Sequence, residues 1–315
     1  MAPSAPRVGF LGFGEAGYHM GKGLTGAGLT GIVAYDKYAA DPKGGDLIRQ
    51  RAAEAGVGLV PSVRRLCRDG NVIIALVPGR AALRAVRAAA PHLTRDHVYV
   101  DAGTASVNAM KEAGRLLEGK AGFVDVAMMG AVPLAGHRVA MLASGSHAEA
   151  FRSAMERFGM NIRVVGEHAG AATAMKLIRS VFMKGVAAVL LEALEAAHRH
   201  GVLQAMADDI GGYMNEHPFP DHIRRFVCGT AVHAERRAYE MSEALTLLKK
   251  LGSADTMTRA THRKLQQMAA LGLRERFGGV EPADVAAVLD ALAPKPLAVP
   301  CGGPGAGPRT TLAGC

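Results

Sequence analysis

The sequence predicts an α/β fold, in which a doubly wound sheet is followed by an all-α C-terminal domain. Three observations carry this prediction. Short apolar runs alternate with helix-compatible stretches over residues 7–166, as in an open, largely parallel sheet with helices on both faces. A glycine-rich turn separates the first apolar run from the first helical stretch. Residues 167–293 contain only helical patterns.

The glycine-rich turn contains Gly12, Gly14 and Gly17 in the pattern Gly-x-Gly-x-x-Gly, directly after the short apolar run that follows Arg7. In such a pattern the first glycine adopts the tight turn, the second lets the backbone approach a pyrophosphate, and the third lets the helix pack closely on the strand. The free N–H groups of the new helix then face the phosphates. In a chain with 39 glycines, an ordinary turn is an equal alternative for this pattern alone.

A second apolar run, residues 31–35, ends in an acid, Asp36, about 20 residues after Gly17, which is where a Rossmann-type unit places the carboxylate that binds the adenosine ribose. We therefore expect a dinucleotide site. A carboxylate repels a 2′-phosphate, so NAD is favoured, and the adjacent Lys37 leaves NADP as the alternative. The expected cofactor-binding residues of this region are Gly12, Phe13, Gly14, Glu15, Ala16, Gly17 and Asp36.

The remaining elements of the first domain follow in order. Strands are expected at 57–60, 71–77, 97–101, 122–127, 139–144 and 161–165. Helices are expected at 46–55, after Gly79 to about residue 90, after Ser106 to residue 117, and at 148–158. Ligands of such sheets bind beyond the carboxyl ends of the strands. Asp36, Val77-Pro78 and Asp101-Ala102-Gly103-Thr104 all stand at such ends.

The pattern changes after Gly166. Residues 169–200 contain no proline and favour one long helix, which leaves the first domain and becomes the spine of a second. Further helices are expected at 205–215, 221–250, 253–271 and 282–292. The expected domains are therefore 7–166 and 167–293, and the tail 294–315, rich in Pro and Gly, is expected to be disordered.

The spine helix places a lysine among small residues. Helical spacing puts Ala172, Thr173, Lys176, Ser180 and Met183 on one face. Partial burial lowers the pKa of a lysine toward neutrality, which suits a proton donor and acceptor. An ordinary solvated lysine is the alternative, and the residues alone favour that alternative.

The composition excludes several classes of protein. At 49% hydrophobic and 21% charged residues the chain is that of a soluble globular protein, and no apolar run is long enough to span a membrane. The first strand begins too early for a signal peptide, and the four cysteines lack metal-ligand spacing, so a cytoplasmic protein without a metal site is expected. The net charge of +9 is spread along a chain without Trp, which argues against a nucleic-acid partner and suits an anionic cofactor and an acidic substrate.

Together these motifs resemble the β-hydroxyacid dehydrogenases, a family that includes 3-hydroxyisobutyrate dehydrogenase and is related to 6-phosphogluconate dehydrogenase. The glycine turn, Asp101–Thr104, Asp125–Gly130 and Gly166…Lys176 occur in the order and spacing of that family, over about residues 7–293. The segments 124–130, 176–185 and 233–241 resemble a branch with an uncharacterised C-terminal helical domain.

The resemblance implies an NAD(P)-dependent dehydrogenase that transfers hydride between the nicotinamide and a 3-hydroxy acid or related β-hydroxy carboxylate. Lys176 is implied as the general acid/base on the substrate hydroxyl. His233, with Arg237 at i and i+4 of one helix, is proposed to face the substrate from the second domain; a solvated face is an equal alternative for Arg237. The implied additional cofactor residues are Val77, Pro78, Gly103 and Thr104, and the implied substrate residues are Thr104, Met129, Gly130, Ser180 and His233.

The chain departs from the family at the substrate positions. Met129-Gly130-Ala131 stands where the family commonly has Ser-Gly-Gly, and Ser180 stands where it usually has Asn. The substrate of better-known members therefore does not carry over. An imine or keto-acid reductase and a non-catalytic dinucleotide-binding module remain alternatives, although Lys176 argues against the imine reductases, which usually replace it.

The helical domain is expected to form a homodimer. The spine helix contains the apolar run 186–191, which is more surface than a small helical domain readily covers.

Overall fold

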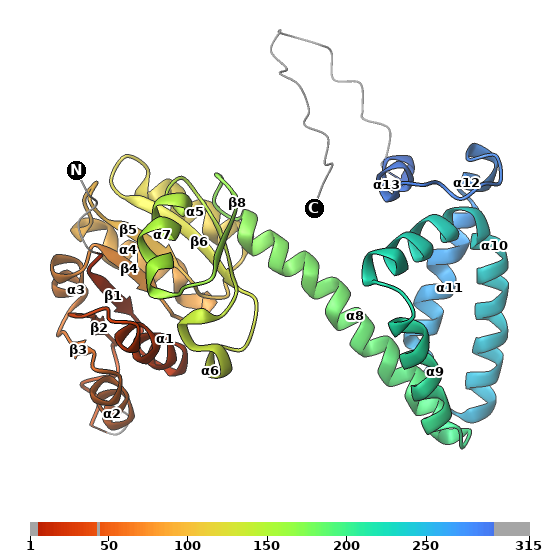
Figure 1. Cartoon of the computed structure of the whole chain (residues 1–315), viewed down its shortest axis with the longest axis horizontal. Helices are drawn as coiled ribbons and strands as arrows, with labels where there is room; N and C mark the ends of the chain where they lie inside the picture. Colours follow the sequence, from red (N-terminus) through yellow and green to blue (C-terminus); the bar gives the residue numbers. More distant parts are fainter. Residues whose placement is uncertain (1–5, 43–44, 293–315) are drawn as a thin grey trace, which may run out of the picture. The chain divides into compact units, whose positions relative to one another are not determined.

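The computed structural model describes residues 6–42 and 45–292 of the chain (Figure 1). The tail 294–315, expected to be disordered, lies outside these residues. The chain divides after Met183 into two units.

The first unit is built on an eight-stranded sheet with the strand order β3-β2-β1-β4-β5-β6-β7-β8. Neighbouring strands are parallel except β6 and β7, which are antiparallel. This confirms the doubly wound α/β sheet. The strands are β1 (Val8–Leu11), β2 (Val33–Tyr35), β3 (Gly58–Leu59), β4 (Val72–Ala75), β5 (Val98–Asp101), β6 (Gly122–Met128), β7 (Met141–Ser144) and β8 (Ile162–Gly166).

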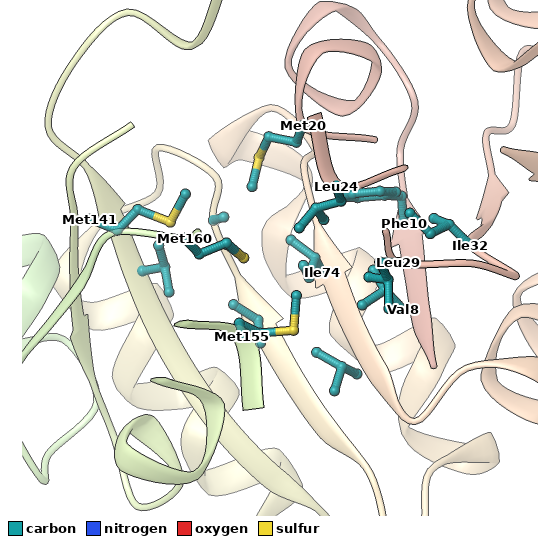
Figure 2. Packing of buried hydrophobic residues seen from close by; sticks show 14 of the residues in the cluster. Val8, Phe10, Met20, Leu24, Leu29, Ile32, Ile74, Met141, Met155 and Met160 are labelled. Carbon is teal, nitrogen blue, oxygen red and sulfur yellow. The ribbon is translucent and has the colours of Figure 1, made fainter. Parts of the chain in front are cut away.

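Helices cover both faces of the sheet because successive strand residues point to opposite sides. In β1, Phe10 packs into one apolar cluster with Met20 and Met155 (Figure 2). Its neighbour Leu11 packs into a second cluster with Leu66. Full burial of such a side chain stabilises the fold by about 1.5–3 kcal/mol. The helices of this unit are α1 (Glu15–Gly26), α2 (Gly45–Ala55), α3 (Val63–Asp69), α4 (Ala82–Ala89), α5 (Val107–Leu117), α6 (Val132–Ala135) and α7 (Ala148–Met155).

A row of residues, each paired with its neighbour on the next strand, crosses six strands of the sheet and marks the edge at which a ligand is expected. These residues are Tyr35, Leu11, Ala75, Asp101, Asp125 and Ser144. β1, β2, β4 and β5 all end on this row. The glycine turn, Asp36, Val77 and Gly103 follow directly, so the structure places all of them at the same carboxyl edge.

The long helix expected after Gly166 is α8 (Ala171–Arg199), and the chain passes from the first unit to the second within it (Figure 1). This point lies beyond the domain boundary that the strand pattern indicates at 166. The reason is that the start of α8 belongs to the sheet: Ala172 is fully buried and forms an apolar cluster with Ala127 and Leu142.

The described residues of the second unit are helical, with no strand, as expected. After α8 come α9 (Leu203–Asn215), α10 (Phe219–Leu251), α11 (Thr256–Ala269), α12 (Leu273–Arg276) and α13 (Val285–Leu292). Cys228, Met268 and Val288 belong to the small core of this unit. The helix expected at 221–250 is interrupted at His233, whose backbone is not helical (φ −111°, ψ 18°).

Two further observations concern the whole described part of the chain. None of its helices combines the length and the apolar character that a membrane crossing requires. Within residues 6–42 and 45–292, no group of three or more His, Cys, Asp or Glu side chains is arranged to hold a metal ion.

Candidate functional site

The glycine turn has the geometry that its sequence pattern predicts. Gly12 lies at φ +94°, and a Cβ there would stand 2.8 Å from the carbonyl oxygen of Leu76, so only glycine fits. A Cβ on Gly17 would stand 3.1 Å from the Gly12 carbonyl oxygen. The start of α1 therefore packs closely on the turn.

Gly14 differs from its two neighbours because nothing lies within 4 Å of a Cβ built on it. It is the N-cap of α1, and no side chain accepts a hydrogen bond there. The first N–H groups of a helix attract anions when no side chain caps them. The open space at Gly14 and the uncapped helix start thus fit the phosphates of a dinucleotide.

Asp36 is attached to the glycine turn. Its Oδ2 accepts a hydrogen bond of 2.8 Å from the backbone N–H of Phe13, and its Oδ1 accepts one of 2.9 Å from the N–H of Tyr38. A carboxylate oxygen can accept more than one hydrogen bond, so ribose hydroxyls can still bind. The ammonium group of Lys37 lies 4.4 Å from the ring centre of Tyr38.

The loops after β4 and β5 pack backbone against backbone. A Cβ on Gly103 would stand 2.8 Å from the carbonyl oxygen of Val77. A Cβ on Gly79 would stand only 1.9 Å from the carbonyl oxygen of Thr104, so Gly79 permits this contact. The structure thus brings Val77, Gly103 and Thr104 together, and Thr104 itself is exposed.

Asp101 and Asp125 are neighbours in the sheet register, and both are fully buried. Asp101 Oδ1 accepts a 3.0 Å hydrogen bond from the N–H of Gly103, whereas its Oδ2 has no partner among the described residues. Burial raises the pKa of the Asp101 carboxyl to about 6; the Gly103 hydrogen bond lowers this pKa, and the Asp125 charge raises it.

Asp125 caps the start of α8 from strand β6. Its Oδ2 accepts hydrogen bonds of 3.0 Å from the backbone N–H groups of both Gly170 and Thr173. Its Oδ1 accepts one of 2.6 Å from the Thr173 hydroxyl. The Ser144 hydroxyl donates to Asp125 Oδ2 at 3.2 Å and accepts from the N–H of Ala172 at 2.9 Å. These buried bonds fix both the position and the rotation of the first turn of the helix.

Lys176 lies between two such attachments of α8. Thr173 is bonded to Asp125, and one guanidinium nitrogen of Arg179 donates a 3.2 Å hydrogen bond to the carbonyl oxygen of Met129, directly after β6. Lys176 follows Thr173 and precedes Arg179 by about one helical turn. Its backbone is therefore held beside the carboxyl end of β6, and its side chain is half-buried.

The remaining expected substrate residues lie in two places. Met129 and Ser180 are half-buried and Gly130 is exposed, all in the first unit. His233 belongs to the second unit, where its Nε2 lies 3.5 Å from Oε1 of Glu281. The structure thus brings His233 together with Glu281 within that unit.

Three contributors escaped the sequence analysis. Gly79 follows Pro78 directly after a predicted strand, and no local pattern names its partner. Ser144 ends a buried strand, and Arg179 follows Lys176 on the helix, but neither stands in a pattern that names its partner. Their roles depend on contacts with residues far along the chain.

Comparisons with known proteins agree with this architecture. The model of the NAD binding domain of 6-phosphogluconate dehydrogenase matches residues 7–166. A domain of unknown function (DUF1932) matches residues 197–268.

Solved structures resemble the whole chain. A conserved hypothetical protein from Sinorhizobium meliloti 1021 is 30% identical, with a TM-score of 0.61, over 92% of this chain and 97% of that chain. The conserved protein MTH1747, of unknown function and described as structurally similar to 3-hydroxyacid dehydrogenases, is 32% identical with a TM-score of 0.58 over 87% and 99%. An imine reductase from Myxococcus stipitatus, 18% identical over 91% and 99% with a TM-score of 0.72, shares the fold.

Proposed function

The chain belongs to the family that carries the NAD-binding domain of 6-phosphogluconate dehydrogenase, and from this premise we propose that it oxidises a 3-hydroxy acid or a related β-hydroxy carboxylate, or reduces the corresponding keto acid. MTH1747, a relative at 32% identity, is described as similar to 3-hydroxyacid dehydrogenases, which supports this reaction class.

The observation that carries the proposal is the fixed position of Lys176. The two attachments of α8, Thr173 to Asp125 and Arg179 to Met129, hold the helix beside the carboxyl end of β6 on either side of this lysine, which supports the proposal. The glycine turn and Asp36 stand at the same edge of the sheet. A proton-transferring group and a dinucleotide site at one edge are what hydride transfer to or from an alcohol requires.

The proposed cofactor residues divide by the part of the dinucleotide that they hold. The turn Gly12–Gly17 holds the pyrophosphate, Asp36 holds the adenosine ribose, and the loops with Val77-Pro78 and Gly103-Thr104 lie beside the nicotinamide. When bound, the nicotinamide supplies or accepts the hydride. NAD is the preferred form, because the Asp36 carboxylate repels a 2′-phosphate.

Lys176 moves the proton in this proposal. In oxidation its neutral amine takes the proton from the substrate hydroxyl, and in reduction its ammonium group returns a proton to that oxygen. In this proposal the Met129-Gly130 backbone, Ser180 and Thr104 orient the substrate, and His233 stays a predicted substrate residue.

A substrate panel tests this function. Hydride transfer is followed by nicotinamide absorbance with 3-hydroxy acids, including β-hydroxy amino acids. Lys176→Ala is expected to lower kcat by about 10²–10⁴-fold, the usual contribution of a general acid or base. The control is Lys184→Ala, which removes an exposed lysine two turns further along α8 and is expected to keep the activity. Near-wild-type turnover by Lys176→Ala overturns the assigned role.

Imine or keto-acid reduction is the second candidate, because imine reductases share the fold. Such an enzyme reduces imines or keto acids with negligible oxidation of alcohols at raised pH. A non-catalytic module instead binds NAD in calorimetry without turnover on any substrate. The same panel, extended with imines and keto acids and run in both directions, therefore separates the three functions.

We also propose that the protein is a homodimer formed through α8. Apolar side chains are exposed along this helix, among them Ile178 (70%), Val181 (77%) and Leu191 (74%). Exposed apolar surface of this extent indicates a protein partner. Light scattering is expected to give twice the mass of one chain, and the mass of a single chain contradicts the proposal.

A further inference from the structure

We propose that the helical unit contains a binding site for an oxyanion, the carboxylate or phosphate group of a small acid, centred on Arg237 of α10. The site goes beyond the proposed function, because it is defined by binding and requires no turnover.

The site is a cavity of about 690 Å³ within the second unit, which is in the usual size range of small-molecule pockets. One face of α10 forms a wall through Phe226, Thr230 and Arg237. Tyr213 of α9, Thr261 of α11, Glu281 and His233 also line the cavity. The cavity thus has an aromatic side, hydroxyl groups and a cationic side.

Arg237 is fixed in this cavity before any ligand arrives. One of its guanidinium nitrogens donates to the Thr230 hydroxyl oxygen, and the same nitrogen lies 3.4 Å from the carbonyl oxygen of Phe226. The Thr230 hydroxyl in turn donates to this carbonyl. An arginine already held in one rotamer loses less entropy when it binds.

Carboxylates line the cavity as well, but none of those described lies at ion-pair distance from the Arg237 guanidinium. Arg236 pairs with Glu240, Glu281 faces His233, and the guanidinium of Arg225 lies 5.5 Å from the ring centre of Tyr213. Among the described residues, Arg237 forms no ion pair with a carboxylate. Guanidinium groups bind carboxylates and phosphates through paired hydrogen bonds, which fits an oxyanion ligand.

The backbone of α10 makes room for this arrangement. Gly229 is buried, and a Cβ there would stand 2.8 Å from the Nη2 atom of Arg237 and 3.2 Å from Oε1 of Glu281. The interruption of the helix at His233 lies between Thr230 and Arg237. A threonine hydroxyl bonded to a carbonyl one turn earlier commonly bends a helix. Thr230 and Gly229 therefore both shape the corner in which Arg237 lies.

Calorimetry with the full-length protein tests the site. Inorganic phosphate and malonate are titrated separately at constant ionic strength, each with and without saturating NAD, which fills the glycine turn. Saturable binding is expected for at least one of these anions in the presence of NAD. The tighter of the two identifies the ligand as a phosphate or as a carboxylate.

Variants assign the binding to Arg237. Arg237→Met is expected to weaken the affinity by at least about tenfold, since one charge-assisted bidentate contact is lost. Arg224→Met removes the same charge from the same helix outside the cavity lining and is expected to change the affinity less than about twofold. Equal affinities of these two variants overturn the proposal.

A second variant, Gly229→Ala, keeps the charge of Arg237, and its urea midpoint shows whether the protein is still folded. Gly229→Ala displaces the guanidinium without removing it, and it is expected to weaken anion binding while the urea midpoint stays near that of the wild type. Wild-type affinity in a folded Gly229→Ala protein, or no saturable binding of either anion, also overturns the proposal. Oxyanion binding without any turnover refutes the proposed enzyme and leaves this site standing.

Discussion

Thr173 Oγ1 donates a 2.6 Å hydrogen bond to Oδ1 of Asp125, and both side chains are buried. The bond joins the first turn of α8 to the strand β6, residues 48 positions apart in the chain. Lys176 follows about one turn later on the same helix. The position of the proposed proton-transferring group therefore depends on a contact that the lysine itself does not make.

Removal of the Thr173 hydroxyl tests this dependence. Thr173→Val leaves a buried carboxylate oxygen without its donor, so the free energy of unfolding is expected to fall by about 1–3 kcal/mol. Turnover is expected to fall as well, because α8 loses one of its attachments. Urea denaturation and kcat of the same preparation measure both effects. Thr173→Ser keeps the hydroxyl and should behave like the wild type; a valine variant of unchanged stability contradicts the argument.

Asp101 makes stability depend on pH. Its pKa is about 6 in the folded protein, against an ordinary value of 3.8, so between these values the folded state binds more protons than the unfolded state. The contribution of Asp101 to stability therefore falls as the pH rises from about 4 to about 6, by roughly 3 kcal/mol for about two pKa units.

Asp101→Asn removes this ionisation and keeps an oxygen for the N–H of Gly103. The variant is expected to be more stable than the wild type at pH 8, by on the order of 1–3 kcal/mol, and to lose this advantage near pH 4. Thermal unfolding across this pH range measures the difference. Asp96→Asn, at an exposed position, provides the control. A constant difference between Asp101→Asn and the wild type at all pH values rules out the explanation.

Substitution of Gly14 by alanine is expected to weaken cofactor binding without disturbing the fold. Nothing lies within 4 Å of a Cβ at Gly14 or at Gly26, the last residue of α1. Both alanine variants should therefore fold, but Gly14→Ala puts a methyl group where the pyrophosphate approaches. We expect it to weaken NAD binding by at least about tenfold in calorimetry, whereas Gly26→Ala binds normally. Unchanged affinity in Gly14→Ala places the phosphates elsewhere.

Asp36 governs the choice between NAD and NADP. Asp36→Asn removes the negative charge and keeps an acceptor for the N–H of Phe13, so the KM for NADP relative to that for NAD is expected to fall about tenfold, or about 1.4 kcal/mol. Lys37→Gln removes the neighbouring positive charge and should change the ratio in the opposite direction. Steady-state kinetics with both cofactors measure the ratios. If neither variant changes the ratio of the two KM values, the 2′ position is recognised elsewhere.

Much of the first unit was predictable from the sequence because its signals are local. The run 71–77 is apolar after Asn71, which indicates a strand buried on both faces, and the structure has β4 there. The pattern at Gly12 and the acid at Asp36 each follow a strand, and parallel strands bring their carboxyl ends to one edge. Residues that end different strands thus come together without any pairwise signal between them.

The sequence by itself determined the α/β architecture, the long helix α8 and the edge of the sheet at which the glycine turn and Asp36 meet. Only the tertiary structure decided that Asp125 caps α8, that Arg179 binds the Met129 carbonyl, and that Gly79 lies against Thr104. Secondary structure follows from periodicity and backbone preference over a few neighbouring residues. A hydrogen bond between residues 50 positions apart depends instead on how whole elements pack, and no local pattern encodes that partner.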